Sequence, residues 1–136
     1  MATKITFQCS VITPERIALE CDAQSVVFPA HDGEQGVLRG RAPLICRMGI
    51  GVLRIETPDG SRRLFVDGGF AQVTDGQLTL LTEQAVEPGE LDAAAGETAL
   101  VEARAMKITN DASWTSRSRA IQRARVQLKL VERRGG

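Results

Sequence analysis

The 136-residue chain is predicted to be mainly β with an α-helical appendage: an N-terminal antiparallel β-sandwich followed by a two-helix antiparallel hairpin. Short apolar runs separated by four Asp-Gly pairs fill the chain up to about residue 87, and Asp-Gly between apolar runs is a strong signal for a β-hairpin. After the break at Glu87-Pro88-Gly89, the chain is rich in Ala, Leu and Glu, which favour helices. We therefore expect a β domain over residues 1–87 and a helical domain over residues 88–136.

Two β-hairpins are predicted within the first domain. Residues 52–56 and 62–66 flank the sequence Thr-Pro-Asp-Gly-Ser. Leu53 and Ile55 alternate with Arg54 and Glu56 as in a half-buried strand. A second pair, residues 70–73 and 78–81, is expected to turn at residues 74–77. Many short strands at close spacing favour a sandwich or barrel.

Two helices are predicted in the second domain. The first covers residues 90–108 and is interrupted by Gly96, which costs about 1 kcal/mol relative to Ala. Residues 109–112 form a turn, Ser113 is the expected N-cap, and the second helix covers residues 114–132. Its apolar face consists of Trp114, Ile121, Ala124, Leu128 and Val131. Because this stripe is narrow, the hairpin is expected to need a docking face and to be mobile.

The charge is polarised along a chain whose net charge is zero. Residues 113–136 hold seven basic residues and one acidic residue, Glu132, so this tail carries +6 and the rest of the chain −6. An acidic partner for the tail is expected.

The sequence holds no run of 18 apolar residues and no signal-peptide pattern. Its three cysteines, Cys9, Cys21 and Cys46, are expected to be reduced, mostly buried thiols.

The residue pattern indicates no catalytic, cofactor-binding or metal site. His31 is the only histidine and has no Cys or His neighbour at ligand spacing. No nucleophile, base and orienting group can be assembled from the spacing. Gly68-Gly69 is interpreted as a tight connection between strands rather than a phosphate loop, since no Lys or helix start follows.

Several segments resemble, in chain order, the epsilon-subunit family of F-type ATP synthases. Residues 33–44 resemble the family stretch GELGILPGHAPL. The other matching segments are VITPERI (11–17), GVLRI (51–55), GGFAQV (68–73), LTLLT (78–82), Leu91-Asp92 and Arg-Ala-Arg (123–125). The ordered set covers nearly the whole chain and is more specific than any one of its members.

The resemblance implies a non-catalytic rotor subunit that couples the gamma stalk to the c-ring during proton- or sodium-driven ATP synthesis. A sandwich of about ten strands is implied to grip gamma and rest on the c-ring, while the hairpin extends toward the α and β catalytic subunits and inhibits ATP hydrolysis. Such a chain lies at the cytoplasmic face of the bacterial inner membrane, or alternatively at the stromal face of the thylakoid, bound to the membrane only through the complex.

Two sets of site residues carry over from the resemblance. Glu34 corresponds to a position near the polar loops of the c-ring, and Arg41 to a position facing gamma; with Arg39 and Pro43 they form the predicted c-ring and gamma interface. The predicted contacts with the catalytic subunits are Arg117, Arg119, Arg123 and Arg125. The alternative for each charged side chain is an ordinary solvated position.

Two further expectations concern nucleotides and nucleic acid. The family's ATP-sensing pattern places Arg where this chain has Ala95, so ATP is expected to bind weakly or not at all. A nucleic-acid-binding module using the basic helix is the alternative function. It is disfavoured because the β region is acidic and poor in the aromatic residues on which bases stack.

Overall fold

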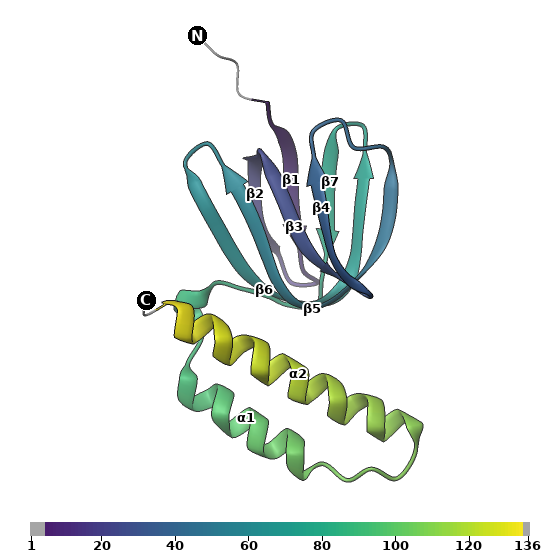
Figure 1. Ribbon diagram of the computed structural model, residues 1–136, viewed down its shortest axis with the longest axis vertical. Coiled ribbons are helices and arrows are strands. Elements are labelled where there is room, and N and C mark those ends of the chain that lie inside the picture. The colour runs from purple at the N-terminus through teal and green to yellow at the C-terminus, as the bar shows by residue number, and fades with distance from the viewer. Residues whose placement is uncertain (1–4, 135–136) are drawn as a thin grey trace. The chain divides into compact units, whose positions relative to one another are not determined.

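The computed structural model describes residues 5–134 and consists of two compact units that divide between Ala85 and Val86. The first unit is built of strands and the second of helices, as Figure 1 shows. The predicted class, a mainly β domain followed by a helical hairpin, is therefore confirmed.

The strands of the first unit form one sheet with the order β2-β1-β7-β6-β5-β3-β4, and β8 pairs with β6. The strands are β1 (Phe7–Ile12), β2 (Ile17–Ala23), β3 (Ser25–Ala30), β4 (Gly33–Leu38), β5 (Leu44–Thr57), β6 (Gly60–Thr74), β7 (Gln77–Leu81) and β8 (Ala85–Val86). These are eight strands within residues 5–134, against the roughly ten that the resemblance implied.

The sheet is mixed rather than wholly antiparallel. Strands β1 and β7 run parallel, from Gln8 opposite Gln77 to Ile12 opposite Leu81. This pairing joins strands that are separated by five others in the sequence. Turn signals reveal only the pairing of consecutive strands, so no local pattern in the sequence indicated the parallel ladder.

Both predicted hairpins are confirmed. Residues 52–56 and 62–66 lie within the long antiparallel ladder of β5 and β6, which closes at Thr57 opposite Gly60. The hydroxyl of Thr57 donates to the carbonyl of Gly60 at 2.8 Å and so holds this turn. At the second turn Asp75 and Gly76 both have positive φ, 49° and 75°, as a two-residue turn of type I′ requires.

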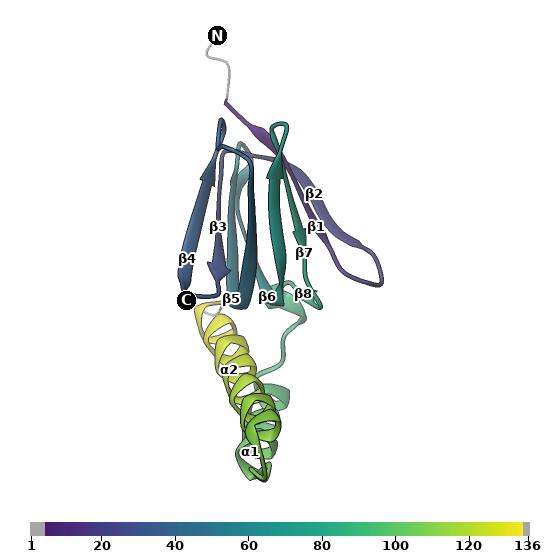
Figure 2. The same cartoon turned by 90° about the vertical axis from the view of Figure 1, so that its right-hand side faces the viewer.

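The core lies between two layers of the coiled sheet. In Figures 1 and 2 β3 and β4 lie on the opposite side from β1, β2 and β7, with β5 and β6 joining the layers. Its largest fully buried residues include Val26, Phe28, Leu53, Ile55, Leu78 and Leu80. They occupy alternate positions of their strands, as residues facing one side of a sheet must.

Gly68 and Gly69 lie inside β6 and do not connect two strands, which corrects the prediction. Their φ values are 68° and 103°. A Cβ atom at Gly69 would collide with the carbonyl oxygen of Leu81. The bend lets the backbone N–H of Asp67 donate to the buried hydroxyl of Thr82 at 3.0 Å, so the glycine pair permits a close crossing of two backbones.

The helical unit contains a short 3₁₀ helix η1 (Pro88–Glu90), α1 (Ala93–Ala105) and α2 (Asp111–Arg134). Helix α1 begins later than predicted because Asp92 is its N-cap and accepts from the N–H of Ala94 at 3.2 Å. The first helix also ends at residue 105 rather than 108, where Met106 adopts an extended ψ of 133°.

Ser113 is not the N-cap of the second helix, contrary to the prediction. The side chain of Asn110 accepts from the N–H of Ser113 at 2.8 Å, and the hydroxyl of Ser113 accepts from the N–H of Asn110 at 3.0 Å. This reciprocal pair is a capping box in which Asn110 is the cap, so α2 begins at Asp111.

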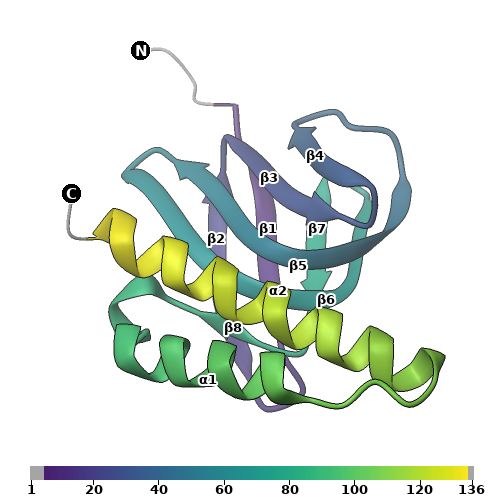
Figure 3. The ribbon, with the colours of Figure 1, turned by 60° about the horizontal axis from the view of Figure 1, so that its bottom comes forward.

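The two helices pack side by side and antiparallel (Figure 3). A Cβ atom at Gly96 would lie only 2.9 Å from Cδ2 of Leu128. Gly96, expected to be only an interruption, is therefore a point of close helix contact, and Ala103 is buried two turns further along α1. On α2, Ala124 is buried, whereas Trp114, predicted on the apolar stripe, is 59% exposed.

No helix in residues 5–134 has the length and apolarity needed to cross a bilayer.

Candidate docking surface

A row of apolar side chains runs across the outer face of four neighbouring strands of the sheet. Ile17, Ile12, Leu81 and Phe70 are successive cross-strand partners on β2, β1, β7 and β6, and the row continues to Arg47 on β5. We call these four apolar residues the apolar row. Ile17 is 57%, Leu81 46% and Phe70 50% exposed, and Ile12 is half-buried.

Strand alternation places these side chains on the outer face. Phe70 is followed by buried Ala71, and Leu81 follows buried Leu80, so the neighbours in sequence point into the core. Ile45, two residues before Arg47 on β5, is 73% exposed. A solvated sheet face normally carries polar residues, so a contiguous apolar row on it is typical of an interaction surface.

The apolar row was not predicted, although the sequence contains a signal for it. Adjacent apolar pairs such as Leu44-Ile45 and Leu80-Leu81 place apolar side chains on both faces of a strand. A strand with one solvated face needs only one of each pair. Such pairs indicate that both faces are covered, but they do not show which strands lie side by side.

The structure separates the residues predicted to contact the c-ring and gamma. Glu34 lies near the start of β4, exposed and paired with Pro29 of β3. Arg39, Arg41 and Pro43 lie in the exposed connection that follows β4, where the N–H of Arg41 donates to the carbonyl of Leu38 at 3.2 Å. Arg39 follows Glu34 by five steps of extended chain, which span about 16 Å. The four residues therefore lie at two separate positions. Glu34 is at one, and Arg39, Arg41 and Pro43 are at the other, which is close to Ile45 in the chain.

The four arginines predicted to meet the catalytic subunits do not share one face of α2. Arg117 donates to the backbone carbonyl of Arg104 at 3.3 Å, in the last turn of α1. Arg123 is half-buried and lines the crevice between the helices together with Ala99 and Ala103. Only Arg119 and Arg125 are exposed. Arg117 and Arg123 therefore lie toward α1 and are less accessible to a partner than Arg119 and Arg125.

The start of α1 carries the residue at which this chain departs from the family's ATP-sensing pattern. The carboxylate of Asp92 caps α1, and Ala95 is exposed. The family pattern has an Arg at this position, and its guanidinium could bind phosphate. The methyl group of Ala95 cannot, so α1 presents no cationic group there. The crevice between α1 and α2, about 360 Å³, is lined by Ala99, Glu102, Ala103, Met106, Ala120, Arg123, Ala124 and Gln127.

Comparison with known proteins places this architecture in a family. Residues 6–88 match the family model described as ATP synthase, Delta/Epsilon chain, beta-sandwich domain. The ATP synthase epsilon chain of Rhodopirellula baltica is 44% identical over 125 residues, which cover 92% of this chain and 98% of that protein.

Solved structures share the fold at lower identity. A chain of the Euglena gracilis mitochondrial ATP synthase, in a structure of OSCP, F1 and c-ring, aligns with a TM-score of 0.80 and 23% identity over 100% of this chain and 85% of its own length. A chain of the Tetrahymena thermophila central stalk and c-ring aligns with a TM-score of 0.73 and 14% identity, over 96% of this chain and 99% of its own length. The sandwich with its helical hairpin and the sequence identity together assign this chain to the family of ATP synthase epsilon chains.

Proposed function

We propose that the chain acts as a non-catalytic subunit of the central stalk of a rotary F-type ATP synthase, where it links the gamma stalk to the c-ring. Membership of the epsilon-chain family supports this function, as do the central-stalk and c-ring assemblies in which proteins of the same fold occur. The observation that carries the proposal is the apolar row, because it equips one face of a small sheet domain for a permanent partner.

The apolar row is the surface for gamma. A part that transmits torque must not dissociate at each turn, and burial of large apolar side chains provides most of the energy of permanent interfaces. Full burial of one Phe, Leu or Ile side chain contributes about 1.5–3 kcal/mol. Phe70, Leu81 and Ile17 are each about half exposed, so covering them supplies part of that amount at each position. Arg47, the cross-strand partner of Phe70 on β5, provides a charged border at that end of the row.

Glu34 is the contact with the c-ring. It lies at the end of β4 remote from Arg39 and is exposed, as a side chain that meets polar loops must be. The chain is held at the membrane surface by these contacts alone, at the cytoplasmic face in a bacterium or the stromal face in a chloroplast.

The helical unit, beginning near residue 88, restrains ATP hydrolysis. Its exposed Arg119 and Arg125 are the side chains available to carboxylates of the catalytic subunits. Arg117 and Arg123 contribute less, because they are already directed at α1.

Binding of gamma tests the proposal directly. The full chain is co-expressed with the gamma subunit of the same ATP synthase, and the two are copurified. Phe70→Glu puts a charge into the apolar row and should lower the affinity for gamma at least tenfold. Val101→Glu, at a helical residue that is 67% exposed, is the matched control and should bind like wild type. Equal binding by wild type and Phe70→Glu, with both folded by circular dichroism, would refute the docking role of the row.

A further inference from the structure

Two of the three cysteines face each other across the sheet. Cys9 of β1 and Cys21 of β2 are directly opposite in the antiparallel register. Cα atoms of directly opposed residues in such a ladder are about 4.5–5.5 Å apart, within the roughly 4.4–6.8 Å range over which disulfides form. Both thiols are free, so the pair has the backbone spacing of a disulfide without the bond.

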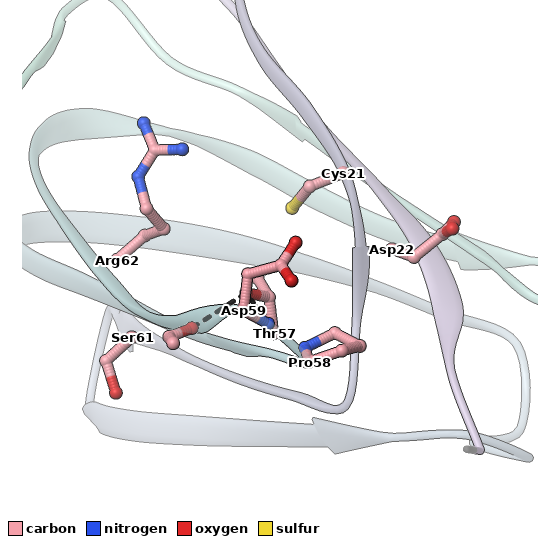
Figure 4. A pocket seen from close by; sticks show the side chains of 8 residues that line it. Cys21, Asp22, Thr57, Pro58, Asp59, Ser61 and Arg62 are labelled. Atoms are coloured by element: carbon pink, nitrogen blue, oxygen red, sulfur yellow. Dashed lines mark hydrogen bonds between the residues drawn. The ribbon is translucent and has the colours of Figure 1, made fainter.

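The two thiols differ in access. Cys9 is fully buried in the core, whereas Cys21 is partly exposed and lines a pocket of about 400 Å³. The other lining residues are Asp22, Thr57, Pro58, Asp59, Gly60, Ser61 and Arg62. Figure 4 shows Cys21 on the wall of this pocket, between Arg62 and Asp22. A small reagent entering the pocket therefore reaches Cys21 and not Cys9.

We propose that Cys9 and Cys21 are a dithiol site that low-molecular-weight disulfides oxidise to a cross-strand disulfide. In the first step the thiolate of Cys21 attacks one sulfur of the reagent. A mixed disulfide on Cys21 forms, and one reagent thiol leaves. In the second step the thiolate of Cys9 attacks the Cys21 sulfur, forms the Cys9–Cys21 bond and releases the second reagent thiol. The protein loses two electrons and two protons, and the reagent disulfide gains both.

The environment of the thiols makes their oxidation slow. Burial, with a smaller contribution from the neighbouring Cys21, raises the pKa of the Cys9 thiol to about 12. Burial also raises the pKa of Cys21, with Arg62 opposing that shift and Asp22 adding to it. Thiolates, not thiols, attack disulfides, so both steps are slow at neutral pH. In the mixed disulfide, the sulfur of Cys21 can be attacked and lies on the residue opposite Cys9. The second step is therefore intramolecular.

The disulfide would link the edge strand β2 covalently to β1. Strand β2 ends the strand order and pairs only with β1 along it. The loop that the disulfide closes runs from residue 9 to residue 21 and contains Ile12 and Ile17, one end of the apolar row. Oxidation therefore fixes the strands that carry this end of the row.

The test is oxidation of the full chain by oxidised glutathione, followed by mass spectrometry. Wild type should lose two hydrogens, and a proteolytic map should join the Cys9 and Cys21 peptides. Closing a loop of this length should raise the Tm by roughly 5–15 °C. Cys46→Ser, at a partly buried cysteine with no facing cysteine, is the control and should behave identically.

Variants separate the two steps. Cys9→Ala should stop at a single glutathione on Cys21, whereas Cys21→Ala should leave Cys9 unmodified. A disulfide involving Cys46, a disulfide between two chains, or a wild-type protein that accumulates the mixed disulfide without closing it would overturn the proposal. The wild-type peptide map decides the matter even if a cysteine variant fails to fold.

Discussion

The β-sheet unit buries large side chains such as Phe28, Leu53 and Ile55 completely. The helical unit, among its described residues, buries Leu130 and otherwise only Gly96, Ala103 and Ala124. Apolar burial stabilises in proportion to area. The contact between α1 and α2 therefore contributes much less to folding stability than the sheet core does. The difference agrees with the proposed function, in which the sheet unit is the stable docking part and the helical unit is the more weakly packed part.

Removal of the helical unit is the strongest test of this comparison. A chain ending at Pro88 should keep its β signal in circular dichroism and still copurify with gamma, because the core residues and the apolar row all lie before residue 88. In the assembled enzyme this truncation should raise ATP hydrolysis. An unfolded fragment would show that the sheet unit depends on the helices, contrary to the division of the chain at residue 85.

Cavity-forming substitutions should affect the two units unequally. Leu53→Ala removes a fully buried side chain and should destabilise the sheet unit by about 3 kcal/mol. Leu128→Ala, at a half-buried position, should cost about 1 kcal/mol. Urea unfolding followed by circular dichroism for the sheet, and by fluorescence of Trp114 for the hairpin, measures both. Similar losses at the two positions would contradict the contrast.

Alkaline pH should destabilise the sheet unit and not the hairpin. Because the pKa of Cys9 is raised to about 12 in the folded protein, the folded state keeps a proton that the unfolded state releases above about pH 9. Stability is therefore complete below pH 9 and falls as pH rises toward 12, by at most about 1.4 kcal/mol per pH unit. Cys9→Ala should reduce this slope in urea unfolding at about pH 8, 9 and 10; an unchanged slope would assign it to other groups.

Gly96→Ala tests the close helix contact. Helix propensity alone predicts a gain of about 1 kcal/mol, but the added methyl would meet Leu128 at 2.9 Å. We expect no net gain in hairpin stability, because the Leu128 side chain must turn out of its place between the helices. In the double variant Gly96→Ala, Leu128→Ala the clash is absent and the propensity gain should reappear. A stabilised Gly96→Ala variant would show that the contact between α1 and α2 has room for the added methyl group.

Charge removal on α2 should have the smallest effect per residue. Arg119→Ala and Arg125→Ala together should raise ATP hydrolysis by the reconstituted enzyme at low salt, since exposed pairs contribute about 0–1 kcal/mol each. The effect should fade at high salt. Arg117→Ala is the contrasting variant, because it should also lower helicity by removing the bond to Arg104. Unchanged hydrolysis in the double variant would argue against an electrostatic restraint.

Local patterns in the sequence determined the fold class, both β-hairpins and the existence of two helices. The turn at Asp75-Gly76 illustrates why: Asp and Gly both tolerate positive φ, and between two apolar runs that property is enough to form a tight hairpin turn. The ordered family segments likewise indicated the family independently of any contact between them. Helix ends were predicted less well, because Asn110 and Ser113 are both good caps and only the geometry of the capping box selects Asn110.

Tertiary structure alone decided which distant residues became neighbours. It produced the parallel pairing of β1 with β7, and with it the alignment of Ile12 and Leu81 that makes single exposed residues into the apolar row. It separated Glu34 from Arg39, turned Arg117 toward α1, and placed Gly96 against Leu128. Residues far apart in the chain meet only when burial of the whole core selects one arrangement of strands, and that choice depends on the sum of many contacts rather than on any local pattern.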